Sequence, residues 1–299
     1  MRIENGEFKE QTGTLYIVPT PIGNMGDISG RVKDTLESVD FVACEDTRVG
    51  GRLLFLLGIK KELVSHHDHN KKQSALRIRD RLLKGESCAL ISDAGTPAVS
   101  DPGELLVDLC IASDVKIIPL PGPCAAVCAL SASGLPSGRF VFEGFLPEKA
   151  KERKKRLAVL SRETRSAILY CAPHDLITLL SDFISTFKES KRRVFIAREL
   201  TKLNEQLVRT TLGKALETAE NGGITMKGEF VIVLEGTTEE PLKENTFWDD
   251  MDIPTHVAHY TALGLSQMDA IKKAAKDRGV AKAVVYDEVV GHRYKEENN

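Results

Sequence analysis

The stretch "SDAGTPAVSDPG" (92–103) directly follows a short apolar run, "CALI" (88–91). Its twelve residues include two glycines, two prolines and two aspartates, a composition typical of a loop at the end of a strand. The spacing of the glycines matches neither the GxGxxG pattern of dinucleotide-binding loops nor the phosphate-binding pattern GxxxxGK followed by Ser or Thr. The sequence therefore predicts a strand followed by a ligand-binding loop of another kind.

The same order of strand, loop and helix recurs through the first half of the chain. Three further apolar runs end in unusual loops, which are "PTPIGN" (19–24), "EDTR" (45–48) and "PGPCA" (121–125). Helical patterns follow at 70–84, 103–113 and 124–133. Such repeats predict a largely parallel α/β sheet. Because ligands of these sheets bind beyond the carboxyl ends of the strands, we expect the four loops to form one site.

The length of 299 residues favours two domains with a small appendage. A proline followed by a dense run of Lys and Arg near 144–156 suggests a boundary, so we expect an N-terminal α/β domain at 13–145. A second α/β domain of mixed character is expected at 146–237. A polar, acidic segment at 237–255 reads as a linker, and residues 256–292 as a helix-turn-helix-like appendage.

Composition excludes several classes of protein. The formal net charge is −2, so any nucleic-acid-binding surface must be local. No apolar run approaches the roughly 20 residues that span a bilayer, and the N-terminus carries no signal-peptide core. The six cysteines form no CxxC pair, which favours reduced thiols in a cytoplasmic protein.

The loops lack the clustered lysines of a triphosphate cradle, and they suit a compact, flat, mostly uncharged ligand held by backbone groups. The histidine-rich segment "SHHDHN" (65–70) suggests a metal site at first sight. Adjacent residues of an extended segment point to opposite faces, however, and rarely converge on one ion. We therefore expect no metal.

Taken together, the motifs resemble the tetrapyrrole methylase superfamily, the class III S-adenosylmethionine-dependent methyltransferases. The resemblance covers about 13–236. It rests on "LYIVPTPIGNMGDIS" (15–29), "ACEDTR" (43–48), "SDAGTPAVSDPG" (92–103), "LPGPCAAVCALSASGLP" (120–136), "FEGFLP" (142–147), "ARELTK" (197–202) and "KGEFVIVLEG" (227–236). Within the superfamily, the chain is similar to the branch that methylates the ribose 2′-OH of a cytidine in the decoding region of 16S rRNA.

This resemblance implies two α/β domains with the cofactor, S-adenosylmethionine, in the cleft between them. It implies the small ribosomal subunit as partner, and a homodimer. The cofactor contacts that it implies from the first domain are Pro21, Asp93, Ala94, Gly95, Val99, Cys124 and Ala125. Tyr170 and Leu200 of the second domain are expected near the adenine. For Asp93, a turn-capping role is the alternative.

The resemblance also implies that charged residues take part in the reaction or bind the RNA. Candidate bases or orienting groups are Glu45, Asp46, Glu199 and Lys202. A desolvated Lys202 with a lowered pKa would act as a base, or it would hold a phosphate. Arg48 is either an RNA contact or an internal partner of Glu45 or Asp46. The expected phosphate contacts of the basic run are Lys151, Arg153, Lys154 and Lys155. A solvated or paired structural charge is the alternative for each.

The chain departs from the family's pattern at three positions. Cys124 stands where the family often has Ser, Asp175 where it usually has Arg, and Asn204 where it usually has His. Two other functions compete with rRNA methylation. One is C-methylation of a porphyrin or corrin precursor, and the other is a non-catalytic module that binds S-adenosylmethionine or RNA. "EDTR", "ARELTK" and the basic run favour the rRNA branch, and the intact cofactor loops argue against a mere binding module.

Overall fold

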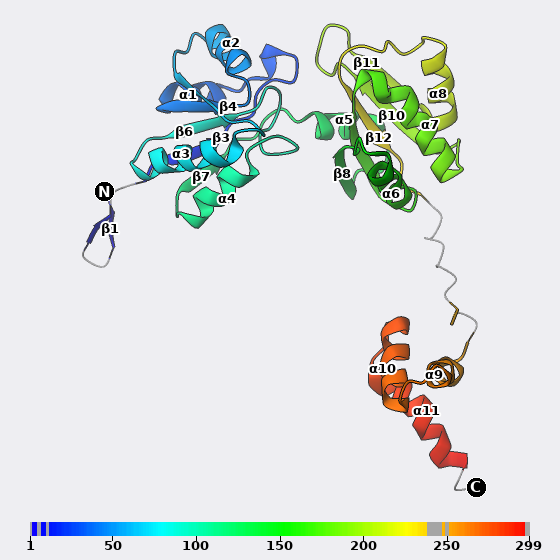
Figure 1. The fold of residues 1–299 in the computed structure, drawn as a ribbon. Helices are drawn as coiled ribbons and strands as arrows, with labels where there is room; N and C mark the ends of the chain where they lie inside the picture. The colour runs from blue at the N-terminus through cyan, green and yellow to red at the C-terminus, as the bar shows by residue number, and fades with distance from the viewer. Residues whose placement is uncertain (1, 5–6, 10–11, 238–246, 249–250, 297–299) are drawn as a thin grey trace. The chain divides into compact units, whose positions relative to one another are not determined.

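A computed structural model describes residues 2–4, 7–9, 12–237, 247–248 and 251–296 (Figure 1). The chain divides into two compact units, Met1–Thr238 and Glu239–Asn299. The first unit contains two five-stranded sheets and a short antiparallel hairpin, β1 (Arg2–Glu4) with β2 (Glu7–Lys9). The second unit contains helices only among its described residues.

The first sheet is parallel throughout, as the sequence predicted. Its strand order is β5-β4-β6-β3-β7. The strands are β3 (Thr14–Ile17), β4 (Phe41–Cys44), β5 (Glu62–Ser65), β6 (Cys88–Ile91) and β7 (Lys116–Pro119). The edge strand β5 was not expected, because its short sequence "ELVS" has little apolar pattern.

Helices cover both faces of this sheet because its strands are apolar on both sides. Along β4, Phe41 and Ala43 pack with α3 (Lys71–Leu83) and α4 (Glu104–Ala112). Val42 and Cys44 point the other way, toward α1 (Gly30–Ser38) and α2 (Thr47–Leu57). The continuous burial of all four β4 residues leaves the strand ends as the places where polar groups reach solvent.

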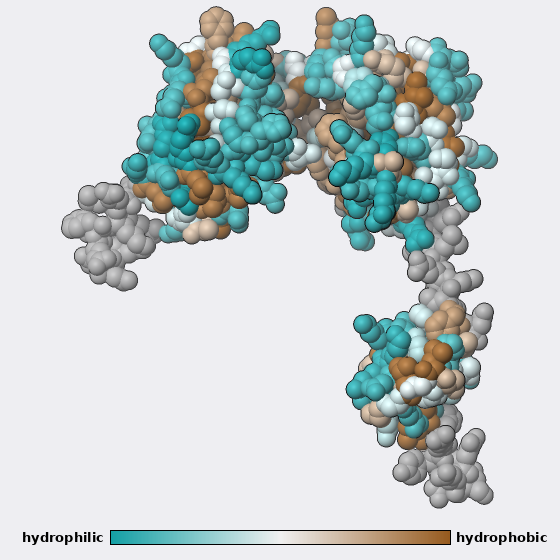
Figure 2. All heavy atoms as spheres, in the orientation of Figure 1, coloured by the Kyte–Doolittle hydropathy of each residue, from teal (hydrophilic) through white to brown (hydrophobic). Residues whose placement is uncertain are grey.

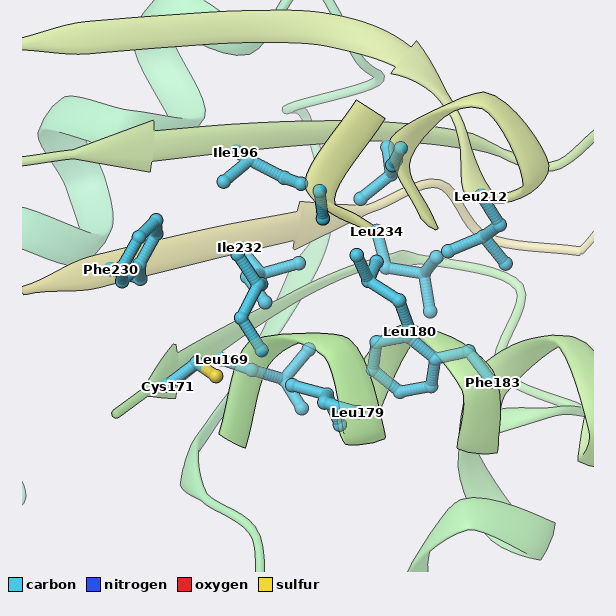
Figure 3. Close-up of a cluster of buried hydrophobic side chains, with 14 of the residues drawn as sticks. Leu169, Cys171, Leu179, Leu180, Phe183, Ile196, Leu212, Phe230, Ile232 and Leu234 are labelled. Atoms are coloured by element: carbon cyan, nitrogen blue, oxygen red, sulfur yellow. The ribbon is translucent and has the colours of Figure 1, made fainter. Parts of the chain in front are cut away.

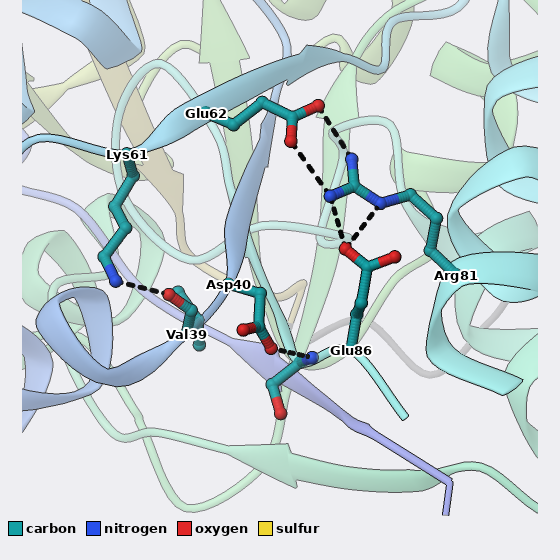
Figure 4. Close-up of polar contacts among 7 residues, drawn as sticks. Val39, Asp40, Lys61, Glu62, Arg81 and Glu86 are labelled. Atoms are coloured by element: carbon teal, nitrogen blue, oxygen red, sulfur yellow. Dashed lines mark hydrogen bonds and ion pairs between the residues drawn. The ribbon is translucent and has the colours of Figure 1, made fainter. Parts of the chain in front are cut away.

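Polar contacts tie together the amino ends of the strands (Figure 4). The guanidinium of Arg81 donates to Glu62 at 2.8 Å and to Glu86 at 3.0 Å, and it lies 3.7 Å from the ring centre of Phe41. The Asp40 carboxylate accepts from the backbone N–H of Ser87 at 2.6 Å. Arg81, Glu62, Glu86 and Asp40 at this edge therefore have their polar partners within the fold.

The second sheet is mixed, with the order β11-β10-β12-β9-β8. Only the pair β8–β9 is parallel. Its strands are β8 (Phe140–Phe145), β9 (Ser166–Cys171), β10 (Arg193–Arg198), β11 (Gln206–Thr211) and β12 (Phe230–Leu234). This agrees with the mixed α/β character expected for the second half.

One face of the second sheet packs against α6 (Ala150–Leu160), α7 (Leu176–Phe187) and α8 (Leu212–Glu220). Figure 3 shows this core, where Leu180 and Phe183 of α7 face the strands. The opposite face packs against α5 (Ala125–Ser133).

Both α5 and β8 precede residue 146, yet they pack with the second sheet. The change from one sheet to the other falls between β7 and α5. The division of the chain into domains at 145/146 stays a prediction.

The C-terminal unit contains α9 (Ile253–Ala262), α10 (Gln267–Arg278) and α11 (Lys282–Glu296). The sequence predicted two helical patterns here, and the structure adds a first helix, α9, which begins in the last three residues of the expected linker and continues into the expected appendage. Asp252 begins α9 by accepting from Thr255 N–H, with a proline in the first turn. Most of the expected linker, 238–246 and 249–250, lies outside the described residues. In the part of the chain that is described, no helix is long and apolar enough to cross a bilayer.

Candidate functional site

The four unusual loops meet at the carboxyl edge of the first sheet, as predicted. Thr20 and Gly95 exchange two backbone hydrogen bonds, at 2.8 and 3.1 Å, which join the "PTPIGN" and "SDAGTP" loops. The Thr96 hydroxyl donates to the Pro123 carbonyl at 2.9 Å, which adds the "PGPCA" turn. The backbone N–H of Asp46 donates to Asp93 at 3.2 Å, which adds "EDTR".

The second half of the loop 92–103 contains residues with strained backbone conformations. Ala98 and Ser100 have φ values of 63° and 64°, in a region that side chains other than glycine rarely adopt. Gly103 has φ 149°, and a Cβ there would lie 2.9 Å from the Ala98 Cβ. Such strain persists only where the surrounding structure holds it, and it is frequent at ligand-binding sites. Between these residues lies Asp101, which lines a cavity.

This cavity, of about 360 Å³, lies between the loops of the first sheet and the strands of the second. It is lined by seven of the nine predicted cofactor contacts: Ala94, Gly95, Val99, Cys124, Ala125, Tyr170 and Leu200. The other two, Pro21 and Asp93, line an adjoining groove instead. Hydrophobic residues are visible in the hollow between the two halves in Figure 2. The volume lies within the range usual for small-molecule sites.

Tyr170 forms an aromatic wall of the cavity. Its ring centre lies 5.2 Å from that of Phe142 and 5.5 Å from that of Phe145. Burial, followed by the charges of Cys124 and Asp101, raises the pKa of Tyr170 to about 12. The hydroxyl is therefore neutral at physiological pH, and the ring offers an apolar face to a ligand.

Three carboxylates near this edge, Glu45, Asp93 and Asp101, form no ion pair within the described part of the chain, although the charge of Arg48 acts on Asp93 without direct contact. Burial, followed by the negative charges of Asp93 and Asp101, raises the pKa of Glu45 above its usual value. Burial also raises the pKa of Asp101, although a hydrogen bond from Ser92 opposes this shift. The edge therefore carries negative charge that the fold itself does not neutralise. Sequence reasoning missed Asp101, although "SDPG" belongs to the same loop as Asp93.

Asp46 and Arg48 partner each other. The Asp46 carboxylate accepts from the backbone N–H of Arg48 at 2.8 Å and from its Nε at 3.0 Å, and it caps α2. The hydrogen bonds from Arg48 lower the pKa of Asp46 to about 2. Of the two roles expected for Arg48, the geometry favours the internal partner.

Lys202 forms ion pairs with two glutamates. Its Nζ donates to Glu199 at 2.8 Å and to Glu229 at 3.0 Å. Burial acts to lower the pKa of Lys202, but these hydrogen bonds outweigh it and raise that pKa. This is the opposite of the lowered pKa expected for a lysine base.

The "ARELTK" loop packs tightly on its neighbours. Glu199 has φ 53°, and a Cβ on Gly228 would lie 2.3 Å from its Oε1. A Cβ on Gly23 would lie 2.3 Å from the Lys202 Cγ. The loop therefore presses against the "PTPIGN" loop of the first sheet and helps to close the cavity.

The basic run lies largely in helix α6, and its basic side chains differ in exposure and in ion pairing. The Arg153 side chain is 14% exposed and donates to Asp182 at 2.8 Å and to Asp175 at 2.9 Å. Asp175, one of the three departures from the family pattern, thus has a structural partner. Of the four predicted phosphate contacts, Lys151, Lys154 and Lys155 are exposed to solvent.

The histidine-rich segment has a structural explanation. His66 is buried, and its Nδ1 lies 2.7 Å from the Ser74 hydroxyl of α3. Among the described residues, no group of three or more His, Cys, Asp or Glu side chains is arranged to hold a metal ion.

Comparisons with known proteins agree with this architecture. The family model "Tetrapyrrole (Corrin/Porphyrin) Methylases" matches residues 14–216. The chain is 43% identical over 279 residues to "Ribosomal RNA small subunit methyltransferase I" of Halalkalibacterium halodurans, covering 93% of this chain and 95% of the relative. The protein of the same name from Escherichia coli O157:H7 is 42% identical over 277 residues, covering 92% and 93%.

A solved structure shares the fold. It is a uroporphyrin-III C-methyl transferase from Thermus thermophilus, complexed with S-adenyl homocysteine. It superposes with a TM-score of 0.54 at 15% identity, covering 75% of this chain and 97% of the other. The match of the family model and the identity to full-length relatives decide the classification. The chain belongs to the tetrapyrrole methylase family and, within it, to the ribosomal RNA small subunit methyltransferase I family.

Proposed function

We propose that this protein transfers a methyl group from S-adenosylmethionine to the ribose 2′-OH of a cytidine in the decoding region of 16S rRNA. The observation that carries the proposal is the cavity at the carboxyl edge of the first sheet, in a chain of this family. We further propose that the protein acts as a homodimer in the cytoplasm, on the small ribosomal subunit.

The cavity suits S-adenosylmethionine in size and in the chemistry of its lining. Apolar surfaces of Ala125, Tyr170 and Leu200 suit the adenine ring. Gly95 has φ 84°, and without a side chain its backbone offers N–H and C=O groups at close range. The Asp101 carboxylate suits a ligand that carries positive charge. The cofactor supplies an electrophilic methyl group on a sulfonium centre.

The protein's part in the reaction is to align the hydroxyl and to receive its proton. Of the four catalytic candidates, Asp46, Glu199 and Lys202 are engaged in ion pairs. Glu45 has no such partner among the described residues, and its raised pKa makes it a stronger base than an ordinary glutamate. We therefore propose Glu45 as the proton acceptor. It directly follows β4 at the carboxyl edge and would act from beside the substrate, because it lines neither the cavity nor the adjoining groove. Ion-paired Glu199 and Lys202 position the loop that closes the cavity.

The RNA contacts that we propose on α6 are Lys151, Lys154 and Lys155, whose exposed ammonium groups suit phosphates. Arg153 is left out because two aspartates hold its guanidinium.

The proposal is tested by incubating the purified protein with methyl-labelled S-adenosylmethionine and either small ribosomal subunits from a strain that lacks the enzyme or, in a parallel reaction, a tetrapyrrole precursor. We expect label in 16S rRNA, at a cytidine ribose, by nuclease digestion and mass spectrometry. Label on a base instead of a ribose would contradict the 2′-O assignment. Label in a tetrapyrrole precursor but not in rRNA would support the alternative C-methyltransferase, and label in neither would support a binding module.

A further inference from the structure

A groove of about 490 Å³ adjoins the cavity, and its lining includes Pro21, Asp93 and Lys202. The groove and the cavity share Ile22, Ala94 and Glu229 in their walls, so the two spaces adjoin. Residues of the "PTPIGN" loop line one part of the groove, and one side of α2 lines another. A substrate in the groove would therefore lie next to the cavity.

Part of the groove is apolar surface exposed to solvent. Met25 and Val49 are each 40% exposed, and Leu56 is 56% exposed. Val49 and Leu56 belong to α2, whose buried residues pack on the first sheet. Apolar side chains of this kind offer contact area to the flat face of an unstacked base or to a ribose.

The cations of this region differ in how far they are neutralised. Lys202 lines the groove, but Glu199 and Glu229 hold its ammonium group. Arg48 is held by Asp46. Arg52 follows Arg48 by four residues, about one turn of α2. Its exposed side chain lines the groove and forms no ion pair within the described part of the chain.

We propose that this groove receives the nucleotide that carries the acceptor ribose, and that Arg52 binds a phosphate next to it. The proposal rests on the proposed function, which supplies an RNA substrate. A guanidinium suits phosphate because it donates two parallel hydrogen bonds and keeps its charge. The apolar side chains beside it hold the sugar and base while the phosphate is fixed, which orients the 2′-OH toward the cavity.

The choice of RNA over another ligand follows from this combination. The carboxylate of Asp93, which also lines the groove, repels phosphate, so a phosphate needs the free cation of Arg52. Asp46 pairs with Arg48, and Glu229 pairs with Lys202. Arg52, and not the Arg48 of the predicted "EDTR" motif, is therefore the arginine that contacts the substrate.

The experiment compares Arg52→Glu and Arg52→Lys with two controls. Arg48→Gln tests the paired arginine, and Arg77→Glu makes the same charge change on an exposed side chain of α3 outside the groove. The measurements are the KM for small ribosomal subunits in the methylation assay, filter binding of deproteinised 16S rRNA across a KCl titration, and the Kd for S-adenosylmethionine.

We expect Arg52→Glu to raise KM on the order of tenfold and to reduce the slope of log affinity against log salt by about 1. Arg52→Lys should keep most of the salt slope, while Arg48→Gln, Arg77→Glu and the cofactor Kd should change little. An unchanged slope in Arg52→Glu, or an equal loss in Arg77→Glu, overturns the inference. If the unmodified protein methylates no rRNA, the proposed function fails first, so the two failures are distinguishable.

Discussion

The charged side chains at the two edges of the first sheet differ in how far they are ion-paired. At the amino edge, Arg81 binds both Glu62 and Glu86 (Figure 4). At the carboxyl edge, Glu45 and Asp101 have raised pKa values and no cation partner in the part of the chain that the structure describes. The same strands connect both edges, so the difference does not come from strand composition. At the carboxyl edge, paired charges such as Asp46 and Arg48 therefore lie beside carboxylates that no ion pair among the described residues neutralises.

Glu45→Gln should have the largest effect in this comparison. Removing a general base slows transfer by roughly a hundredfold or more, so kcat should fall by that factor while the cofactor Kd stays near its original value. In the unmodified protein, the acid limb of the kcat profile should lie at a higher pH than an ordinary glutamate gives, because the pKa is raised. Steady-state assays across pH measure both.

Stability separates this role from a structural one. A carboxyl whose pKa is raised by folding favours the folded state at low pH, and that contribution is lost as pH rises through the raised pKa. Glu45→Gln should therefore be at least as stable as the original at neutral pH, by urea unfolding. Glu37→Gln, on the exposed surface of α1, serves as the control. A large loss of stability with unchanged kcat would assign Glu45 to the fold.

Asp101→Asn should have the next largest effect. The carboxylate lines the cavity, so its removal takes away an attraction for a cationic ligand. We expect roughly tenfold weaker binding of S-adenosylmethionine, about 1.4 kcal/mol, and a smaller change for S-adenosylhomocysteine, which lacks the sulfonium charge. Isothermal titration of both ligands measures this. Asp108→Asn, an exposed position on α4, is the matched control, and equal losses for both ligands would exclude a charge-based role.

Arg81→Met should have the smallest effect, and this effect should fall on the free energy of unfolding and not on catalysis. The substitution leaves Glu62 and Glu86 without their cation and removes the contact over Phe41. We expect the free energy of unfolding to fall by about 1 kcal/mol with kcat and cofactor Kd unchanged. Urea denaturation, with Arg79→Met on the same helix as control, measures the change. Impaired catalysis in a folded Arg81→Met protein would remove the contrast between the edges.

Much of the fold could be predicted from local patterns. Apolar runs such as "CALI" and the loops that follow them identified the parallel sheet and the edge at which these loops meet. The edge strand β5 and the helix α9 were missed. β5 is too short to show a period, and α9 is preceded by a polar, proline-containing segment that resembles a linker. Neither α5 nor β8 shows in its own sequence that it packs with the second sheet.

The site was predictable as a set of loops but not as a set of charges. Seven of the nine predicted cofactor contacts line the cavity because backbone geometry places them there. Arg48, Arg153 and Lys202 each have a carboxylate partner, and Arg153 has partners 22 and 29 residues away. A run of basic residues does not reveal such partners, so it could not separate Arg153 from Lys154.

The sequence by itself determined the family, the alternation of strands and helices, and the loops at the ends of the strands. These properties are local, because hydrophobic period and turn chemistry act over a few residues. Only the tertiary structure decided which charges are free. Ion pairing depends on side-chain positions within about 4 Å, which long-range packing sets. The loop "SDAGTPAVSDPG" illustrates both kinds of information. Its composition predicts a ligand-binding loop, whereas its packing places Asp101 in the wall of the cavity.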